Sequence, residues 1–478
     1  MTKTAWIAAL LLLAGCGSTD TIPDRLRARL GTLGAAPKTE FSADEVATAL
    51  SRQLRVADTA FPTQRTLTAF YADRADRLTW SDDSGKPLPR TSPAMDVLKR
   101  SAEHGLDPED YEIPRLESLR AGLGGRLDDA AATRLADFDV LLTAAVLRYA
   151  SDVATGRVHP DEVQESWHSQ PPEIDFVAEL RRAADADDVA GWLERLPPPH
   201  PGYARLREAL ATLRASNDPR IPEVELNLER WRWVPRALGD THVLVNIPAF
   251  DLQLVRGTSV AQRMKIVVGS AFDNPTPVFS DKIVSIVVNP PWNVPESIAV
   301  KEYLPELRRN RNALARQRLR VLQGAGNDER EVDPRSVDWS RVDEEKFPYH
   351  LRQDPGEGSA LGRLKFDLTN TFHIYLHDTP AGHLFGRAER DLSHGCIRVE
   401  RPLDLAMELM PGDAGTRLRE ALDQSEERHL PVQPPVQVHI VYLTAWVEED
   451  GSLQTAPDVY LLDPPQRAAI DRQRGASK

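Results

Sequence analysis

The 478-residue chain has few cysteines, few long apolar runs and a deficit of positive charge. Its only two cysteines, Cys16 and Cys396, each lie in a short motif of their own. Beyond the N-terminal stretch, no segment is apolar enough to cross a membrane. With 59 basic and 72 acidic residues, the formal net charge is −13, which argues against a dedicated nucleic-acid-binding protein.

Residues 1–15 are typical of a secretory signal, because an early lysine precedes an apolar core that is too short to span a bilayer. The run Leu-Ala-Gly-Cys that ends at Cys16 resembles the lipobox of bacterial lipoproteins, which implies that Cys16 is lipidated. Cys396 then has no partner for a disulfide. No aspartate follows Cys16, so the resemblance implies an outer-membrane lipoprotein on the periplasmic face. The alternative is a plain cleaved signal with an incidental cysteine.

About 460 residues follow this signal, enough for two or three domains. Residues 16–42 are small, polar and charged, and we expect them to form a tether. Residues 43–215 are expected to form a helical domain. In particular, apolar side chains recur at helical spacing between 135 and 149, and Gly156 offers a C-terminal stop.

From residue 241 the apolar period changes to two, which predicts a mostly β domain over 241–465, after a linker at 216–240 and before a tail at 466–478. Within it, the arginine-rich stretch 304–322 looks helical. It is either a solvated helix face or part of a mobile lid inserted at about 298–365. The predicted fold class is therefore α+β. Strands are predicted at 242–247, 250–255, 263–268, 282–288, 371–377 and 436–447, and short helices at 203–213 and 402–410.

Cys396 is a candidate nucleophile. It lies in the run Ser-His-Gly-Cys-Ile-Arg at 393–398, and His377 lies nineteen residues upstream. A thiol becomes a strong nucleophile when an imidazole takes its proton and backbone N–H groups face the oxyanion that forms. Gly395 would let the backbone approach a substrate carbonyl closely. The alternative is a buried, inert cysteine beside a histidine that packs in the core.

A zinc site is the competing hypothesis for the same residues, since His373, His377, His394 and Cys396 are all possible ligands. However, apolar and polar residues alternate over 371–377, which predicts a strand. Two histidines four residues apart on a strand stand roughly 13 Å apart, too far for one ion ligated at about 2 Å. We therefore expect neither a metal nor another cofactor.

The spacing of His377 and the 393–398 run resembles the signature of the L,D-transpeptidases, whose catalytic unit is the YkuD-type β domain. Arg398 and the run Tyr-Leu-His-Asp-Thr-Pro at 375–380 are similar to the large periplasmic subgroup with a helical scaffold domain and a lid. The resemblance covers roughly residues 45–465. It extends to the segments 105–111, 156–160, 227–233, 289–295 and 360–366. The small peptidoglycan-binding module common in that subgroup is expected to be absent, because too few residues separate the two domains.

The resemblance implies an acyltransferase that acts on peptidoglycan stem peptides. Cys396 would attack the carbonyl of the third residue of a tetrapeptide, expel D-alanine, and pass the acyl group to an amine of a neighbouring stem. His377 would accept the thiol proton. N–H groups near Gly395 and Cys396 are expected to form the oxyanion hole, while His394 and Ser393 shape the loop. The expected substrate-binding residues are Arg398, which could instead support the loop, and Tyr375 and Trp292, which could instead be core residues.

Two other functions are compatible with the same residues. Water could take the thioester, which would make the enzyme a wall peptidase or amidase. Alternatively, the chain could be a non-catalytic wall-associated lipoprotein that recruits other wall-synthesis proteins. An anchor needs neither Cys396 nor His377, so their presence argues against the last hypothesis.

Overall fold

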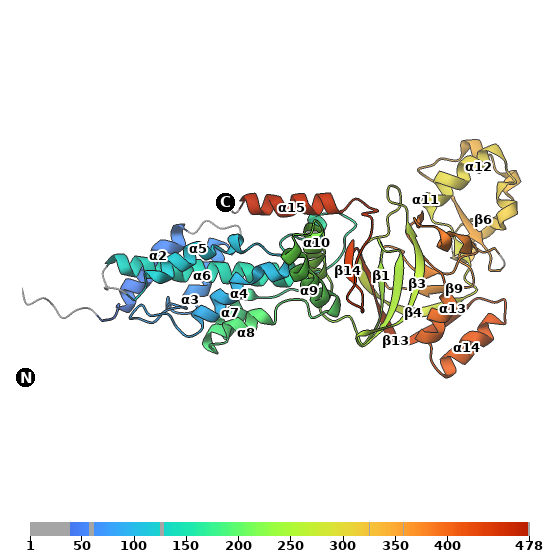
Figure 1. Ribbon diagram of the computed structural model, residues 1–478. Helices are drawn as coiled ribbons and strands as arrows, with labels where there is room; N and C mark the ends of the chain where they lie inside the picture. Colours follow the sequence, from blue (N-terminus) through green and yellow to red (C-terminus); the bar gives the residue numbers. More distant parts are fainter. Residues whose placement is uncertain (1–38, 57–61, 125–128, 325, 357, 477–478) are drawn as a thin grey trace, which may run out of the picture.

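The computed structural model describes residues 39–56, 62–124, 129–324, 326–356 and 358–476. They form an elongated molecule with a helical region at one end, a β-rich region at the other, and a small lobe that projects from the β-rich region (Figure 1). The α+β fold class is confirmed. None of the helices in these ranges is both long and apolar enough to span a bilayer.

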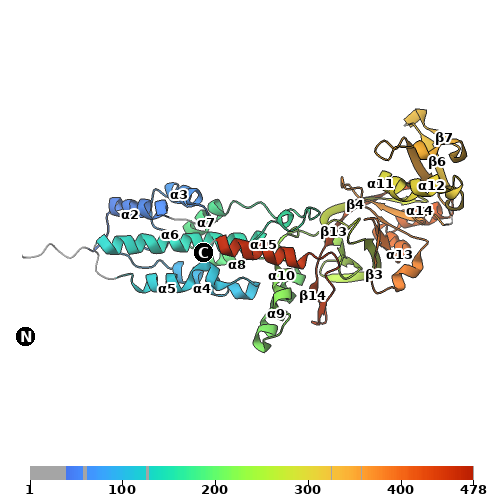
Figure 2. The same ribbon diagram turned by 90° about the horizontal axis from the view of Figure 1, so that it is seen from above.

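The helical region is built around α6 (Asp129–Thr155), most of whose apolar residues from Leu135 onward are buried. Helices α2 and α3 lie on one side of α6, and α4 and α5 on the other (Figure 2). The predicted stop is confirmed, since Gly156 follows the helix with φ +94°, a conformation that favours glycine. The other helices are α2 (Ala43–Val56), α3 (Gln64–Ala72), α4 (Thr91–Lys99), α5 (Ile113–Ala121), α7 (Phe176–Asp185) and α8 (Val189–Glu194).

Residues 216–240 were expected to be a linker, but about half of this stretch is helix α10 (Ile221–Arg232), packed against α9 (Pro201–Ser216). The expectation was wrong because polar residues in this stretch are buried. Arg230 is 2% exposed and pairs with Asp463 at 2.6 Å. Arg232 is 1% exposed and forms an ion pair with Glu229. Their charges are neutralised inside the junction between the helical and β-rich regions.

The β-rich region is a nine-stranded sheet in the order β11-β3-β12-β10-β9-β4-β13-β1-β2, and the additional pairing of β3 with β2 closes it into a barrel. Alternate residues of its strands, such as Val243 and Val245, fill the barrel core. The strands are β1 (Thr241–Asn246), β2 (Asp251–Arg256), β3 (Ser259–Gly269), β4 (Phe279–Val288), β9 (Leu364–Asp367), β10 (Leu376–His377), β11 (Asp391–Ser393), β12 (Ile397–Val399) and β13 (Arg428–Val441).

Three helices and a hairpin complete this region. Helices α13 (Pro402–Leu409) and α14 (Asp413–Leu422) pack against the barrel core, and β14 (Ala445–Val447) pairs with β15 (Leu453–Thr455). Helix α15 (Asp463–Ala476) runs back beside α10 toward the helical region (Figures 1 and 2). The predicted strands between 242 and 288 and the two predicted short helices are confirmed.

The predicted strand over 371–377 is wrong for its first five residues. Only Leu376 and His377 are in a strand. The side-chain oxygen of Asn370 accepts hydrogen bonds from the N–H groups of Phe372 (3.0 Å) and Ile374 (3.1 Å), and His373 has φ +58°. An asparagine that binds backbone groups a few residues ahead favours a turn over a strand.

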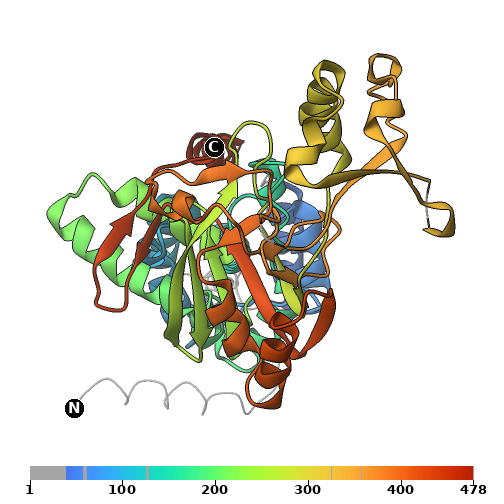
Figure 3. The ribbon, with the colours of Figure 1, turned by 90° about the vertical axis from the view of Figure 1, so that its right-hand side faces the viewer.

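The projecting lobe has its own small sheet, ordered β5-β8-β6-β7, and its own apolar core (Figure 3). The helix predicted over 304–322 ends at Arg309, and its last residues belong to β6. Its basic residues are partly neutralised, since Arg308 pairs with Glu344 at 2.7 Å. The elements are β5 (Trp292–Asn293), α11 (Glu296–Ile298), α12 (Leu304–Arg309), β6 (Leu319–Gln323), β7 (Arg330–Val332) and β8 (Tyr349–Gln353). We call this lobe, residues 292–353, the lid.

Candidate active site

The cysteine and the upstream histidine come from two neighbouring strands. β10 and β12 are parallel, with Leu376 opposite Ile397 and His377 opposite Arg398. Cys396 directly precedes β12, and its side chain and that of His377 line the same cavity. The nineteen residues from His377 to Cys396 provide the crossover connection that two parallel strands require.

The loop before Cys396 is fixed by buried hydrogen bonds. The Ser393 hydroxyl donates to the carbonyl of Cys396 at 2.6 Å and accepts from the N–H of Gly395 at 3.3 Å. From the adjoining strand connection, the Thr276 hydroxyl donates to the carbonyl of Gly395 at 2.7 Å. Gly395 has φ +106°, which strongly favours glycine over any other residue. Thr276 was not found from the sequence, where nothing distinguishes it from other threonines.

The His377 imidazole is buried and electrically neutral. Its Nδ1 lies 2.5 Å from the carbonyl oxygen of Asp378, which assigns the ring proton to Nδ1 and leaves Nε2 as an acceptor. Burial, together with the nearby charges of Arg398 and Lys365, lowers the pKa of His377 to about 3. The ring is therefore a base with a free lone pair throughout the ordinary pH range.

The thiol of Cys396 is also held in its neutral form. Burial raises its pKa, although Tyr375, Lys365 and Arg398 act in the opposite direction. Its Sγ lies 3.7 Å from the carbonyl oxygen of His373. The resting state is thus a neutral thiol and a neutral imidazole in one cavity, rather than a preformed thiolate–imidazolium pair.

Two basic side chains lie beside this pair. Lys365 stands over the ring of Tyr375, with its Nζ 4.5 Å from the ring centroid, and forms an ion pair with Asp367 at 2.7 Å. Arg398 is half-buried, and its Nε is buried without a hydrogen-bond partner among the described residues. Arg398 consequently has donor capacity left for a ligand.

Cys396, His377 and Arg398 line one cavity of about 460 Å³ between the barrel and the lid. Of the residues singled out in the sequence, it is lined by Trp292, Tyr375, His377, Ser393, His394, Cys396 and Arg398. Gly395 is not among the residues that line the cavity, and it affects the site through the backbone conformation of the loop. The lid adds Glu302, Tyr303, Arg316 and Gln353, which the sequence did not identify because nothing in it fixes how the lid is placed.

The lid and the catalytic loop are joined by an ion pair between Glu302 and His394. A second cavity, of about 380 Å³, lies on the other side of the Glu302–His394 pair, and it is lined in part by Asp273, Lys301 and Asp391. In the part of the chain that the structure describes, no three His, Cys, Asp or Glu side chains are grouped so that they could hold a metal ion. Cys16 lies outside the described residues.

Two parts of the chain match known protein families. Residues 240–432 match the model described as the L,D-transpeptidase catalytic domain (YkuD), and residues 65–210 match the model described as the Scaffold domain. A protein of Haemophilus influenzae named "Putative L,D-transpeptidase" is 32% identical over 335 residues, which are 68% of this chain and 66% of that protein. The chain thus spans just under two thirds of the length of this relative.

Solved structures of similar proteins include the Ldtfm–avibactam carbamoyl enzyme, with 13% identity, a TM-score of 0.19, and coverage of 43% of this chain and 50% of that chain. Another is an L,D-transpeptidase from Mycobacterium smegmatis, with 10% identity, a TM-score of 0.20, and coverage of 42% and 58%.

Proposed function

The chain contains an L,D-transpeptidase catalytic domain preceded by a scaffold domain, and from this we propose that it cross-links peptidoglycan stem peptides through a thioester on Cys396. The observation that carries the proposal is the neutral thiol of Cys396 and the buried, neutral imidazole of His377 in one cavity. The substrate is a tetrapeptide stem, and the products are D-alanine and a link between two third-position residues.

In the first half-reaction, Nε2 of His377 takes the thiol proton as Sγ of Cys396 bonds to the carbonyl carbon of the third residue. The tetrahedral oxyanion then collapses and the C–N bond to D-alanine breaks. The proton on His377 passes to the departing amine, so D-alanine leaves with an uncharged amino group. The acyl group stays on the sulfur of Cys396 as a thioester. In the second half-reaction, an amine of another stem loses its proton to His377 and attacks the thioester carbonyl. The C–S bond then breaks as His377 returns this proton to the departing sulfur, which restores the thiol and the neutral imidazole.

The oxyanion needs backbone donors beside the sulfur. The N–H of Gly395 donates to Ser393, so the N–H of Cys396 is the better candidate in this arrangement of the loop. Ser393 holds the loop through its hydrogen bond to the carbonyl of Cys396. His394 holds it through its contact with the lid residue Glu302. Tyr375 lies against the thiol.

Arg398 binds a carboxylate of the substrate in this proposal. Lys365 is already paired with Asp367, whereas the guanidinium of Arg398 retains a buried, unpaired Nε–H at the cavity. A guanidinium can hold a carboxylate through two parallel hydrogen bonds. Trp292 would pack against the bound stem from the lid.

We also propose that the protein works outside the cytoplasm, anchored at the periplasmic face of the outer membrane by lipid on Cys16. Residues 43–215 would form the scaffold unit and residues 241–465 the catalytic unit, with the lid inserted in it. Other wall-synthesis proteins are the partners to test at the scaffold unit.

The test is to incubate the purified protein with soluble tetrapeptide and to identify the products by mass spectrometry. We expect D-alanine, a cross-linked dimer and an acyl adduct on Cys396. The variant Cys396→Ala should release no D-alanine while its circular dichroism spectrum is unchanged. Tripeptide without dimer would mean a hydrolase. Equal release by the variant would remove Cys396 as the nucleophile, and no release by either protein would favour a non-catalytic lipoprotein.

A further inference from the structure

The lid contributes one arginine, Arg316, to the lining of the catalytic cavity. It belongs to the short 3-10 turn Ala313–Gln317 that precedes β6, and its side chain is exposed. The guanidinium of Arg316 has no hydrogen bond, ion pair or ring contact with any of the residues that the structure describes. Its donors are therefore all available to a ligand in the cavity.

The turn that carries Arg316 is held in place by the residue next to it. The Tyr303 hydroxyl donates to the side-chain oxygen of Gln317 at 2.8 Å, and Nε2 of Gln353 donates to the carbonyl of Gln317 at 2.8 Å. Gln353 is 5% exposed, and its side-chain oxygen accepts from the N–H of Ala360 at 2.8 Å. The backbone of Arg316 is thus fixed at the cavity, while its long side chain remains free to meet a ligand.

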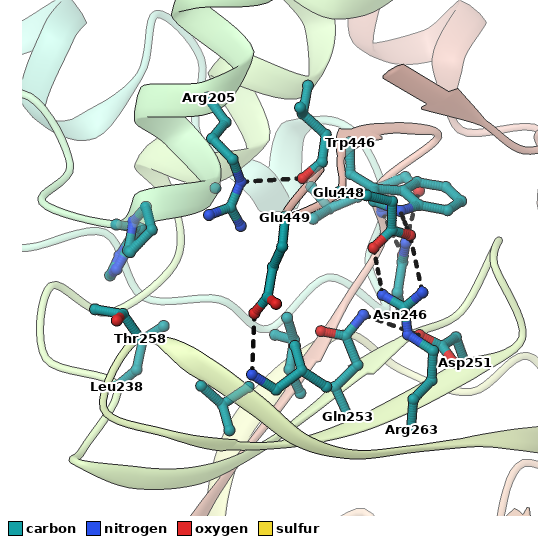
Figure 4. Close-up of a pocket in the computed structure, with 18 of the residues that line it drawn as sticks. Arg205, Leu238, Asn246, Asp251, Gln253, Thr258, Arg263, Trp446, Glu448 and Glu449 are labelled. Carbon is teal, nitrogen blue, oxygen red and sulfur yellow. Dashed lines mark hydrogen bonds and ion pairs between the residues drawn. The ribbon is translucent and has the colours of Figure 1, made fainter. Parts of the chain in front are cut away.

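The arginines at another pocket of the molecule, between α9, α10 and the β1–β2 hairpin, offer a comparison (Figure 4). There Arg205 donates to the carbonyl of Val447 at 3.1 Å, and Arg263 pairs with Glu448 at 2.6 Å. Both of these arginines use donors within the protein, whereas the guanidinium of Arg316 uses none among the described residues.

The balance of charge in the catalytic cavity favours an anionic ligand. Its lining contains two arginines, Arg316 and Arg398, and one carboxylate, Glu302, which is already paired with His394. In the neighbouring cavity of about 380 Å³ the balance is reversed, because three acidic residues and one lysine line it. A ligand with more than one carboxylate is therefore attracted to the catalytic cavity and disfavoured in its neighbour.

We infer that Arg316 binds a carboxylate of the stem peptide other than the one that Arg398 binds. The inference rests on the proposed function, which supplies the stem tetrapeptide as the ligand. Such a stem carries carboxylates at its second residue, on the side chain of its diamino acid and at its C-terminus. Arg398 lies two residues beyond Cys396, close to the reacting carbonyl, whereas Arg316 comes from the lid. A guanidinium from each side can hold one carboxylate by two parallel hydrogen bonds, so the lid selects stems by their free carboxylates.

The test measures binding without turnover, in the full chain with Cys396→Ala as the parent. Isothermal titration calorimetry compares the unmodified tetrapeptide with three derivatives, each with a different carboxylate converted to a carboxamide. Arg316→Ala should weaken binding of the unmodified peptide roughly fivefold, between the effects of an exposed ion pair and of a buried charged hydrogen bond. One derivative should bind the parent about fivefold more weakly and lose nothing further in the variant, and it identifies the carboxylate that Arg316 holds.

Arg318→Ala is the matched control, because it removes the same charge from an exposed side chain two residues further along that does not line the cavity. This control should bind all four peptides as tightly as the parent. Arg316→Lys should recover only part of the lost affinity, since it keeps the charge without the fork.

Equal weakening in Arg316→Ala and Arg318→Ala would overturn the inference in favour of a general effect of positive charge on the lid. A loss in Arg316→Ala that is the same for all four peptides, or no saturable binding by the parent, would overturn it as well. Release of D-alanine is measured separately on the chain with Cys396 intact. A chain that shows the expected coupling in binding but releases no D-alanine would refute the proposed function and leave the carboxylate contact standing.

Discussion

At the scale of single residues, burial decides the charge state of Cys396 and His377, the proposed catalytic pair. Removing Cys396 from water raises the pKa of its thiol, and removing His377 lowers the pKa of its imidazole. Both effects favour the uncharged forms. Proton transfer must therefore accompany the attack on the substrate, instead of preceding it as in enzymes that keep a thiolate ready.

This charge state predicts an unusual pH profile. An ordinary histidine with a pKa near 6.5 would lose its basic form as the pH falls through that value. His377 remains unprotonated down to about pH 3, so kcat/KM for D-alanine release should be flat from about pH 5 to 8. Steady-state rates across that range give the profile. A fall in kcat/KM toward acid pH with a midpoint near 6.5 would show instead that His377 titrates normally.

Arg398 offers a second prediction at this scale. If its guanidinium holds a substrate carboxylate, Arg398→Ala should lower kcat/KM for tetrapeptide by roughly ten- to a hundredfold, since a hydrogen bond to a charged group contributes about 1.5–3 kcal/mol. Arg398→Lys should restore only part of the activity because it loses the forked geometry. The exposed Arg401→Ala serves as the control. A variant that loses stability but keeps its KM would place Arg398 in loop support.

At the scale of elements, the lid contacts the loop before Cys396 through an exposed hydrogen-bonded pair, Glu302 and His394. Glu302 belongs to a π-helical turn of the lid, Ala299–Tyr303, and its side chain is 50% exposed, while that of His394 is 39% exposed. Such a pair adds little to global stability. Its effect is local, because it fixes where the lid meets the loop that carries Cys396.

Glu302→Ala should therefore slow acylation while leaving the melting temperature unchanged. We expect a loss of about two- to fivefold in the rate of adduct formation on Cys396, in line with the worth of an exposed pair. Rapid-quench mass spectrometry follows the adduct. Glu306→Ala, one turn further along the lid, is the matched control and should be silent. Equal slowing in both variants would argue for a general weakening of the lid.

The sequence predicted elements well where a simple period governs them and poorly where polar side chains act on the backbone or are buried. The alternation of apolar and polar residues correctly predicted β1 to β4, because the side chains on one face of each strand fill the barrel core. It failed before His377, where Asn370 forms a turn within a run that alternates like a strand. The residue types around Cys396 identified most of the cavity, but the lid residues depend on long-range packing that no local pattern encodes.

At the scale of the whole molecule, the junction between the helical and β-rich regions is built on buried charge. Arg230 donates to Asp463 (2.6 Å), to Gln466 (2.8 Å) and to Thr444 (3.0 Å), and its guanidinium also lies over the ring of Trp167. One side chain thus joins α10, the end of the barrel and α15. Removing one partner from such a buried network leaves the others unpaired.

Arg230→Ala should accordingly lower the free energy of unfolding by about 3–5 kcal/mol. Chemical denaturation, followed by tryptophan fluorescence and circular dichroism together, measures the change. Arg220→Ala, which removes a solvent-accessible pair with Asp218 at the opposite end of α10, should alter stability little. If Arg230→Ala were as stable as the parent, the hydrogen bonds of Arg230 would not be what holds the helical and β-rich regions together.

Helix α15 gives the junction a further property, which concerns the order of assembly. Two of the partners of Arg230, Asp463 and Gln466, belong to this helix, the last one that the structure describes. A chain that is threaded across a membrane from its N-terminal end would deliver these two residues after α10 and after the barrel strands. The helical and β-rich regions could then begin to fold before the hydrogen bonds of Arg230 to α15 were made, so these bonds would form late in assembly.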